Sequence, residues 1–203
     1  ALAAIAAKSS VLRAMAEPSE SVGADVTQLA DAIGLDARIG RRFLNAGLGF
    51  GGGCLPKDIR AFMARAGELG VDQALTFLRE VDNINDRRRK HTVELARTAV
   101  GGEFTGKRVD ILGAAFKPNS DDMRNSPALD IANSITGQGA HVVITDPAAG
   151  PVLARERPDM DVAPDVATTV AGADVVLLLT EWQEFCDLDP HALKAHVATP
   201  WII

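Results

Sequence analysis

The range 174–180 has the sequence DVVLLLT, an apolar run without alternation. Such a run is typical of a strand that is buried on both faces, as in a parallel sheet. Two strand signals precede it, RVDILG at 108–113 and HVVITDP at 141–147, and WII at 201–203 predicts the start of another strand. Helices are predicted among these strands, at 126–137, 166–173 and 190–196. Alternating strands and helices predict a doubly wound α/β sheet of the Rossmann-like kind.

The first half of the chain is predicted to be helical instead. Residues 1–16 are rich in Ala, Leu, Ile and Met, which favour helices. Pro18 is expected to kink or end that helix, because proline lacks a backbone donor and clashes with the preceding turn. Further helices are predicted at 25–33, at about 58–70 and at about 72–99. The sequence therefore predicts two domains, a helical domain at residues 1–100 and a Rossmann-like sheet domain at 101–203.

The composition excludes several classes of protein. The 203 residues carry 21 basic and 27 acidic side chains, and Arg87–Lys90 is the one basic run, so nucleic acid is not an expected partner. No apolar run approaches the length of a membrane span. Two distant cysteines and four histidines without ligand spacing predict neither a disulfide framework nor a metal site. We therefore expect a reduced, cytoplasmic setting.

The candidate active site is a glycine-rich segment, GLGFGGGCLPKD at 47–58. Glycines permit positive φ and a close approach of the backbone to a ligand. We interpret Cys54 as a nucleophile, since an exposed thiol near a cation such as Lys57 favours the thiolate; a buried structural thiol is the alternative. Asp58 could act as a base for water or could cap a helix, and residue chemistry leaves both open. Cys186 is interpreted as structural.

Four basic residues have both a functional and an ordinary interpretation. Arg38 precedes the glycine-rich segment and suits phosphate recognition, or it belongs to a solvated basic face. Lys117 and Arg124 follow the carboxyl end of the strand at 108–113, where open α/β sheets bind ligands, or they belong to an ordinary polar loop. For Lys8, composition alone favours a surface lysine with a buried stem.

The turn after the strand at 108–113 lacks a nucleotide fingerprint. Residues 113–117 read GAAFK, and not the G-x-G-x-x-G of dinucleotide-binding sheets. This sheet is therefore predicted to suit a nucleotide other than NAD.

These motifs together resemble the UDP-glucose/GDP-mannose dehydrogenase family, and within it they are most similar to the bacterial UDP-glucose 6-dehydrogenases. The matching segments span nearly the whole chain and lie at 23–26, 36–40, 43–47, 49–58, 113–117, 122–124, 145–147 and 180–182. The resemblance implies a helical central domain that forms a homodimer and a following domain that binds a UDP-sugar. It implies an oxidoreductase that converts the C6 alcohol of UDP-glucose to the carboxylate in two NAD-dependent steps, which serves polysaccharide biosynthesis.

The resemblance also implies roles for individual residues. Cys54 would form a thiohemiacetal and then a thioester, Asp58 would assist the water that hydrolyses the thioester, and Lys8 would steady the oxyanion. Lys57 and Arg124 would contact NAD. The implied substrate contacts are Arg38, Phe43, Leu44, Asn45, Ala46, Gly47, Gly51 and Lys117.

The sequence departs from the family pattern in three ways. The family has an amino-terminal NAD-binding domain, and the chain begins in mid-helix without it, so we expect both ends to be cuts. Arg13 stands where the family has an active-site asparagine, and an Asp-Gly-Arg segment of the family would follow Ile203. We therefore expect an enzyme whose isolated 203-residue part is inactive. The alternatives are a GDP-mannose or UDP-N-acetyl sugar dehydrogenase, and a non-catalytic module that binds a sugar nucleotide or dimerises.

Overall fold

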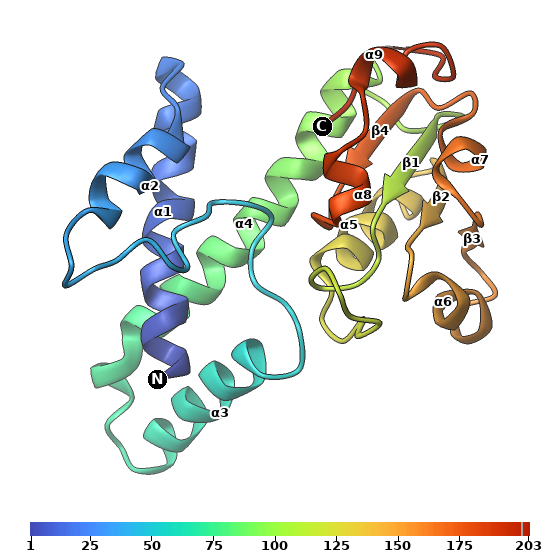
Figure 1. The fold of residues 1–203 in the computed structure, drawn as a ribbon. Coiled ribbons are helices and arrows are strands. Elements are labelled where there is room, and N and C mark those ends of the chain that lie inside the picture. The colour runs from blue at the N-terminus through green and yellow to red at the C-terminus, as the bar shows by residue number, and fades with distance from the viewer. Residues whose placement is uncertain (200) are drawn as a thin grey trace. The chain divides into compact units, whose positions relative to one another are not determined.

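The chain forms two compact units, Ala1–Arg89 and Lys90–Ile203. A computed structural model describes residues 1–199 and 201–203, and Figure 1 shows the first unit as helical and the second as built around a sheet. The division between the units falls inside one helix, α4 (Thr76–Ala99). The boundary at residues 100 and 101 that the sequence indicates stays a prediction.

The first unit packs its helices around two apolar clusters. Its elements are α1 (Leu2–Val22), α2 (Val26–Gly34), α3 (Leu55–Glu68), the 3-10 helix η1 (Asp72–Leu75) and the first part of α4. One cluster joins α1, α3 and α4 through Ala6, Phe50, Ile59, Leu78 and Val81. The other joins α1 and α2 through Leu12, Ala30 and Leu44. Phe50 and Leu44 belong to the long segment between α2 and α3, so burial of these two side chains fixes that segment on the helices.

Helix α1 continues past Pro18, so the prediction that this proline ends the helix is wrong. The helix ends at Gly23, whose φ of 69° gives the left-handed conformation that is common at a helix carboxyl terminus. Pro18 is exposed and lies in the last turns of the helix, where its missing N–H removes one hydrogen bond of the helix. The hydroxyl of Ser19 donates to the carbonyl of Met15 at 2.8 Å and adds support in the same turn.

The second unit is a parallel sheet with the strand order β3-β2-β1-β4. Its strands are β1 (Arg108–Leu112), β2 (His141–Thr145), β3 (Asp161–Val162) and β4 (Val175–Leu178). Its helices after α4 are α5 (Pro127–Thr136), α6 (Gly150–Glu156), α7 (Val166–Val170), α8 (Gln183–Cys186) and α9 (Pro190–Leu193). Both α5 and α7 contact β1 and β2, and Figure 1 shows them on opposite sides of the sheet. The predicted α/β fold class is confirmed.

Strand β4 confirms the interpretation of the apolar run at 174–180. Val175, Val176 and Leu177 are fully buried. The predicted strand at 201–203 contributes one isolated parallel bridge, between Ile202 and Val176. Three elements, α6, β3 and α8, were not predicted.

A buried carboxylate lies in the middle of β1. Asp110 is fully buried, and the Nε of Arg108 donates to its two carboxylate oxygens at 3.1 and 3.0 Å. Burial raises the pKa of Asp110 to about 6, although the Arg108 charge opposes this shift. The guanidinium also donates to the carbonyl of Thr169 at 2.9 Å, so it keeps a second partner in α7.

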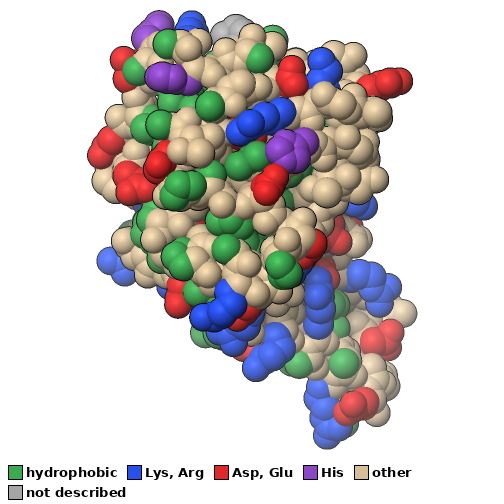
Figure 2. Space-filling view, turned by 90° about the vertical axis from the view of Figure 1, so that its right-hand side faces the viewer, with side chains coloured by type: hydrophobic (Ala, Val, Ile, Leu, Met, Phe, Trp, Pro, Cys, Tyr) green, Lys and Arg blue, Asp and Glu red, His purple; other side chains and the backbone are tan. Residues whose placement is uncertain are grey.

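Figure 2 shows charged side chains of both signs on one face of the molecule. None of the helices in the described part of the chain combines the length and the apolar character of a membrane span.

Candidate active site

Cys54 lies at the amino end of helix α3 and its thiol is free and exposed. Its carbonyl accepts a hydrogen bond from the backbone N–H of Asp58 at 2.9 Å, so Cys54 is the residue that caps the helix. The first turn of a helix presents unpaired N–H groups and a partial positive charge, which favour an anion such as a thiolate. Cys54 therefore has the access that a nucleophile requires, at the amino end of a helix.

Asp58 does not cap the helix, so that interpretation is wrong. Helix α3 begins at Leu55, three residues before Asp58. Pro56 fits the first turn, where a missing N–H costs no hydrogen bond. Asp58 lies in the first turn, one turn after Cys54, and both Asp58 and Lys57 are exposed. Its assignment as a base for water stays a prediction.

The side chain of Asn85 holds the glycine-rich segment on helix α4. Its Oδ1 accepts from the N–H of Phe50 at 2.7 Å, and its Nδ2 donates to the carbonyl of the same residue at 3.0 Å. One turn later, Arg89 donates to that carbonyl at 2.9 Å. Gly49 makes this approach possible: its φ is 113°, and a Cβ there would meet the Asn85 Oδ1 at 2.4 Å. The backbone four residues before Cys54 is therefore clamped to a helix.

Lys8 holds the segment after α2 by its backbone. Its ammonium donates to the carbonyls of Ile39 (2.6 Å), Gly40 (2.9 Å) and Arg42 (2.7 Å). An ammonium has three hydrogens, so these bonds engage all of them. The described contacts of Lys8 do not reach Cys54, and contact with an oxyanion would require Lys8 to release a carbonyl.

Arg13 reinforces this attachment one turn further along α1. It donates to the carbonyl of Ala46 at 2.9 Å and to the Ser9 hydroxyl at 2.9 Å. Burial, together with the charges of Arg88 and Arg89, lowers the pKa of Arg13 to about 10. Where the resemblance expects an active-site asparagine, the structure therefore has a buried cation that braces the loop.

Four of the predicted substrate residues line one cavity in the first unit. The cavity measures about 250 Å³, and its walls are Val26, Thr27, Arg41, Leu44, Asn45, Ala46 and Gly47. Phe43 is not part of the wall; it has a φ of 64° and a 58% exposed side chain. Arg38 points its guanidinium at Asp36, with the closest pair of atoms 2.6 Å apart. Gly51 is buried in the segment before Cys54.

In the second unit, the carboxylate of Asp146 organises the carboxyl end of the sheet. It lies directly after β2 and accepts from the N–H groups of Ala114 (2.8 Å) and Ala115 (3.0 Å), which follow β1. The same oxygen accepts from the indole N–H of Trp182, after β4, at 3.2 Å. The loops after three neighbouring strands are thus joined at one side chain.

The predicted ligand contacts Lys117 and Arg124 both lie in the loop that leaves this turn. Lys117 is exposed and follows Phe116. Arg124 pairs with Asp122 at 2.7 Å, and the hydrogen bonds of Arg124 lower the pKa of that carboxyl to about 2. Arg124 therefore reaches a ligand only with this carboxylate beside it.

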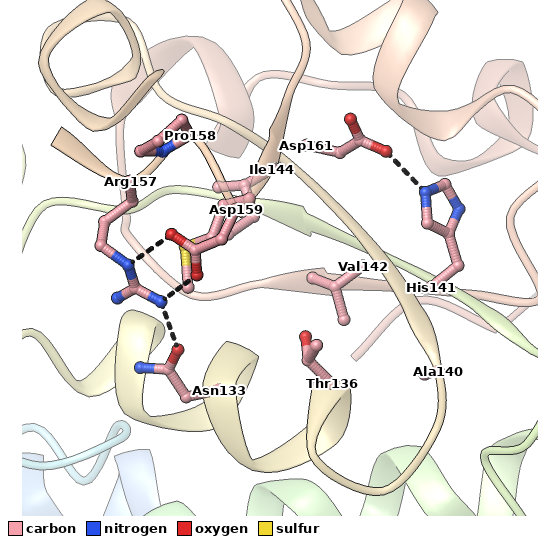
Figure 3. Close-up of a pocket in the computed structure, with 11 residues that line it drawn as sticks. Asn133, Thr136, Ala140, His141, Val142, Ile144, Arg157, Pro158, Asp159 and Asp161 are labelled. Atoms are coloured by element: carbon pink, nitrogen blue, oxygen red, sulfur yellow. Dashed lines mark hydrogen bonds and ion pairs between the residues drawn. The ribbon is translucent and has the colours of Figure 1, made fainter. Parts of the chain in front are cut away.

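A second cavity, of about 220 Å³, opens at the other end of the sheet (Figure 3). His141, the first residue of β2, pairs with Asp161 at 2.6 Å, and Arg157 pairs with Asp159 at 2.7 Å and with Asn133 at 3.2 Å. These side chains satisfy one another, and open α/β sheets bind ligands at the carboxyl ends of their strands. The described residues also bring no three His, Cys, Asp or Glu side chains together in a way that could hold a metal ion.

Sequence reasoning missed Asn85 and Asp146 as organisers of the site. The sequence pattern could have indicated Asn85. It lies on the same helix face as Leu78 and Val81, and an amide on an apolar face indicates a specific hydrogen-bond partner. Asp146 carried a weaker signal, its position directly after a strand. Cys186 is exposed at the end of α8, so its assignment as a structural thiol finds no support in burial.

Comparisons with known proteins agree on one family. Residues 2–87 match the central domain of the UDP-glucose/GDP-mannose dehydrogenase family, and residues 110–203 match its UDP binding domain. The chain is 39% identical to UDP-glucose 6-dehydrogenase TuaD of Bacillus subtilis over 98% of its own length and 43% of that protein. It is 36% identical to a UDP-glucose 6-dehydrogenase of Rhizobium meliloti, over 98% of itself and 45% of that protein.

A solved structure of a UDP-glucose dehydrogenase from the hyperthermophilic archaeon Pyrobaculum islandicum superposes with a TM-score of 0.85. The two are 32% identical, and the match covers 93% of this chain and 43% of that one. The chain thus spans less than half the length of these relatives. It belongs to the UDP-glucose/GDP-mannose dehydrogenase family and carries that family's central domain and UDP binding domain.

Proposed function

We propose that this chain is part of a dehydrogenase that oxidises the C6 alcohol of UDP-glucose to the carboxylate of UDP-glucuronate, with NAD as the hydride acceptor. The observation that carries the proposal is the exposed Cys54 thiol at the amino end of α3, on a segment that Asn85 clamps. The names of the relatives, UDP-glucose 6-dehydrogenases, support the choice of substrate.

The proposed roles follow the geometry of the first unit. Cys54 is the nucleophile that holds the oxidised sugar carbon, and Asp58, one turn later, assists the water that releases it. The backbone of residues 43–47, with Gly51, holds the sugar nucleotide, and Arg38 contacts it. In the second unit, Lys117 stays a proposed substrate contact. We propose that Lys8 acts first as the residue that positions the segment at 39–42, because its three hydrogens are bound there.

The second unit does not fit NAD at the first turn of its sheet. The turn has Gly113 at the first fingerprint position but Ala115 and Pro118 at the other two, and its N–H groups at Ala114 and Ala115 are taken by Asp146. Lys57 in the first unit and Arg124 in the second each stay a proposed contact to NAD. We therefore propose that the 203-residue chain does not turn over NAD by itself. A cytoplasmic location stays a prediction.

Two exposed cysteines allow a matched test of the nucleophile. Cys186→Ser leaves Cys54 as the single thiol, and Cys54→Ser leaves Cys186. We expect a thiol probe to label Cys54 faster than Cys186 and UDP-glucose to protect Cys54 alone. Equal rates and no protection would leave Cys54 without a catalytic assignment.

A thermal-shift titration identifies the sugar nucleotide. A ligand at 100 times its Kd stabilises the folded state by about 2.7 kcal/mol, which raises Tm by roughly 5–10 °C for a chain of this size. We expect that rise with UDP-glucose and not with GDP-mannose or a UDP-N-acetyl sugar. The opposite preference would replace UDP-glucose with the sugar nucleotide that binds.

A non-catalytic module that binds a sugar nucleotide is the second candidate. Arg13 and Lys8 favour it, because both cations are engaged in bracing a loop. A Tm rise with UDP-glucose combined with an unreactive Cys54 would establish this candidate in place of the first.

We also propose that the chain forms a homodimer through the helical unit. Val11, Met15 and Val22 lie on one face of α1 at helical spacing and are 52%, 43% and 77% exposed. An apolar stripe of this kind is typical of a surface covered by a partner.

Sedimentation velocity tests the homodimer. The natural sequence should sediment as two chains and Met15→Asp as one. Phe62→Asp, at an exposed position of α3, should leave the dimer intact. A single chain in all three samples would reject the homodimer.

A further inference from the structure

We propose that the Asp146 carboxylate is a built-in anion that fills the backbone anion site at the first turn of the sheet and so bars a nucleotide phosphate from it. The inference deepens the proposed function, on which it rests only for the ligand being a nucleotide. It assigns Asp146 a role in specificity: the residue decides where on the sheet a nucleotide does not bind.

One oxygen of the carboxylate closes the turn. Strands β1 and β2 pair in parallel with Leu112 opposite Thr145, so Asp146 reaches the end of β2 beside the turn that follows β1. Its Oδ2 accepts from the consecutive N–H groups of Ala114 and Ala115 at 2.8 and 3.0 Å. Consecutive N–H groups that point at one atom form an anion-binding concavity.

The other oxygen and the surroundings complete an anion site. Oδ1 accepts from the N–H groups of Ala148 (3.0 Å) and Ala149 (2.7 Å), and Trp182 donates to Oδ2. Asp146 is 5% exposed, and among the described residues its side chain accepts from these N–H donors. A buried carboxylate needs several charge-assisted hydrogen bonds to offset its loss of hydration. The five donors supply them.

The rest of the turn is equally occupied. The hydroxyl of Ser126 donates to the carbonyl of Ala114 at 2.6 Å, and that of Thr180 donates to the carbonyl of Ala115 at 2.8 Å. Both alanines are essentially fully buried. In a dinucleotide-binding sheet the N–H groups of this turn face a pyrophosphate, and the acid from the second strand faces a ribose. Here the acid turns inward and takes the place of the phosphate.

Chemical rescue tests the inference directly. Asp146→Ala in the 203-residue chain removes the internal anion and leaves the donors facing a space that formate can enter. The control is Asp161→Ala, which removes an exposed carboxylate of the same unit that has one ion pair. Tm is measured in sodium formate and in sodium chloride at equal ionic strength.

We expect Asp146→Ala to melt well below the natural chain, and formate to restore roughly half of the lost Tm in a saturable manner. The natural chain and Asp161→Ala should show no difference between the two salts. An equal formate effect in all three chains, or none in Asp146→Ala, would overturn the inference.

A second variant covers the case in which Asp146→Ala stays unfolded in both salts. Asp146→Asn keeps the size of the side chain and has one acceptor oxygen in place of two. Amide exchange of Ala114 and Ala115, or of Ala148 and Ala149, should then become about tenfold faster, with the Ala163 amide, bonded to the Ile144 carbonyl at 2.8 Å, as an unchanged control. Natural protection at both pairs would overturn the inference.

The outcome is separable from the proposed function. If UDP-glucose fails to stabilise the natural chain while formate rescues Asp146→Ala, the proposed substrate is rejected and the role of Asp146 as an internal anion is supported. If UDP-glucose binds and neither variant behaves as expected, the internal anion alone is rejected.

Discussion

Gly113→Ala is expected to destabilise the second unit by more than about 4 kcal/mol. Gly113 has a φ of 107°, and a Cβ there would lie 2.4 Å from the Cβ of Thr180 and 2.7 Å from its backbone nitrogen. Thr180 has no room to retreat, since its N–H donates to the Leu112 carbonyl at 3.3 Å and its hydroxyl to the Ala115 carbonyl. The added methyl group therefore meets backbone and a fixed side chain.

Tryptophan fluorescence during urea unfolding measures this loss in the right unit. Both tryptophans, Trp182 and Trp201, belong to the second unit. The control is Gly102→Ala: Gly102 has a φ of 105°, and a Cβ there meets nothing within 4 Å. This control isolates the backbone strain, which costs roughly 1–2 kcal/mol. Equal losses for both variants would show that Thr180 gives way and that the close approach has no consequence.

Asp110→Asn is expected to stabilise the second unit by about 3 kcal/mol at pH 7 to 8. The pKa of Asp110 rises from 3.8 when unfolded to about 6 when folded. Between these values the folded state holds the proton more tightly, so stability falls as pH rises and stays reduced above pH 6. A shift of about two units corresponds to about 3 kcal/mol. Asparagine removes this penalty, and Arg108 keeps the Thr169 carbonyl as a partner.

Urea unfolding of both chains at several pH values between 4 and 8 checks the sign. The natural chain should lose stability from pH 4 to 6, and the difference between the chains should be largest above pH 6. Asp122→Asn is the control of opposite sign, because the Arg124 bonds lower the pKa of that carboxyl to about 2. Its carboxylate stabilises the fold above pH 4, so this variant should be less stable at pH 7. A parallel pH dependence in the natural chain and Asp110→Asn would contradict the account.

The parts of the fold that follow from periodicity were predictable from the sequence. The apolar run that became β4 is rich in Val and Leu and has the length of a strand, which favours a strand buried on both faces. The two-residue strand β3 carries no such pattern, and it exists because Asp161 and Val162 pair with β2. Proline rules also failed at Pro18, where an exposed position in the last turns tolerates the missing donor.

The chemistry of the site was predictable in kind but not in arrangement. A cysteine behind glycines marked the candidate nucleophile, and the structure places it at a helix amino terminus. The partners of Lys8 lie 31 to 34 residues away, and those of Asn85 lie 35 residues away. Such bonds depend on packing between elements, which a pattern along the chain does not encode. The occupation of all three Lys8 hydrogens is of this kind.

The junction at Asp146 also bears on the order in which the second unit assembles. Its bonds join residues 32 and 36 positions apart, and at the start of β1 the backbone N–H of Arg108 donates to the Asp174 carboxylate, 66 positions away. The separations are long because every strand pair among the described residues is parallel and needs a crossover. Closing such long loops lowers the conformational entropy of the chain before the stabilising contacts have formed, so parallel sheets fold slowly. The junction completes only after the ends of three strands have met. We therefore expect it to form late in folding, so that weakening it speeds unfolding and leaves the folding rate nearly unchanged.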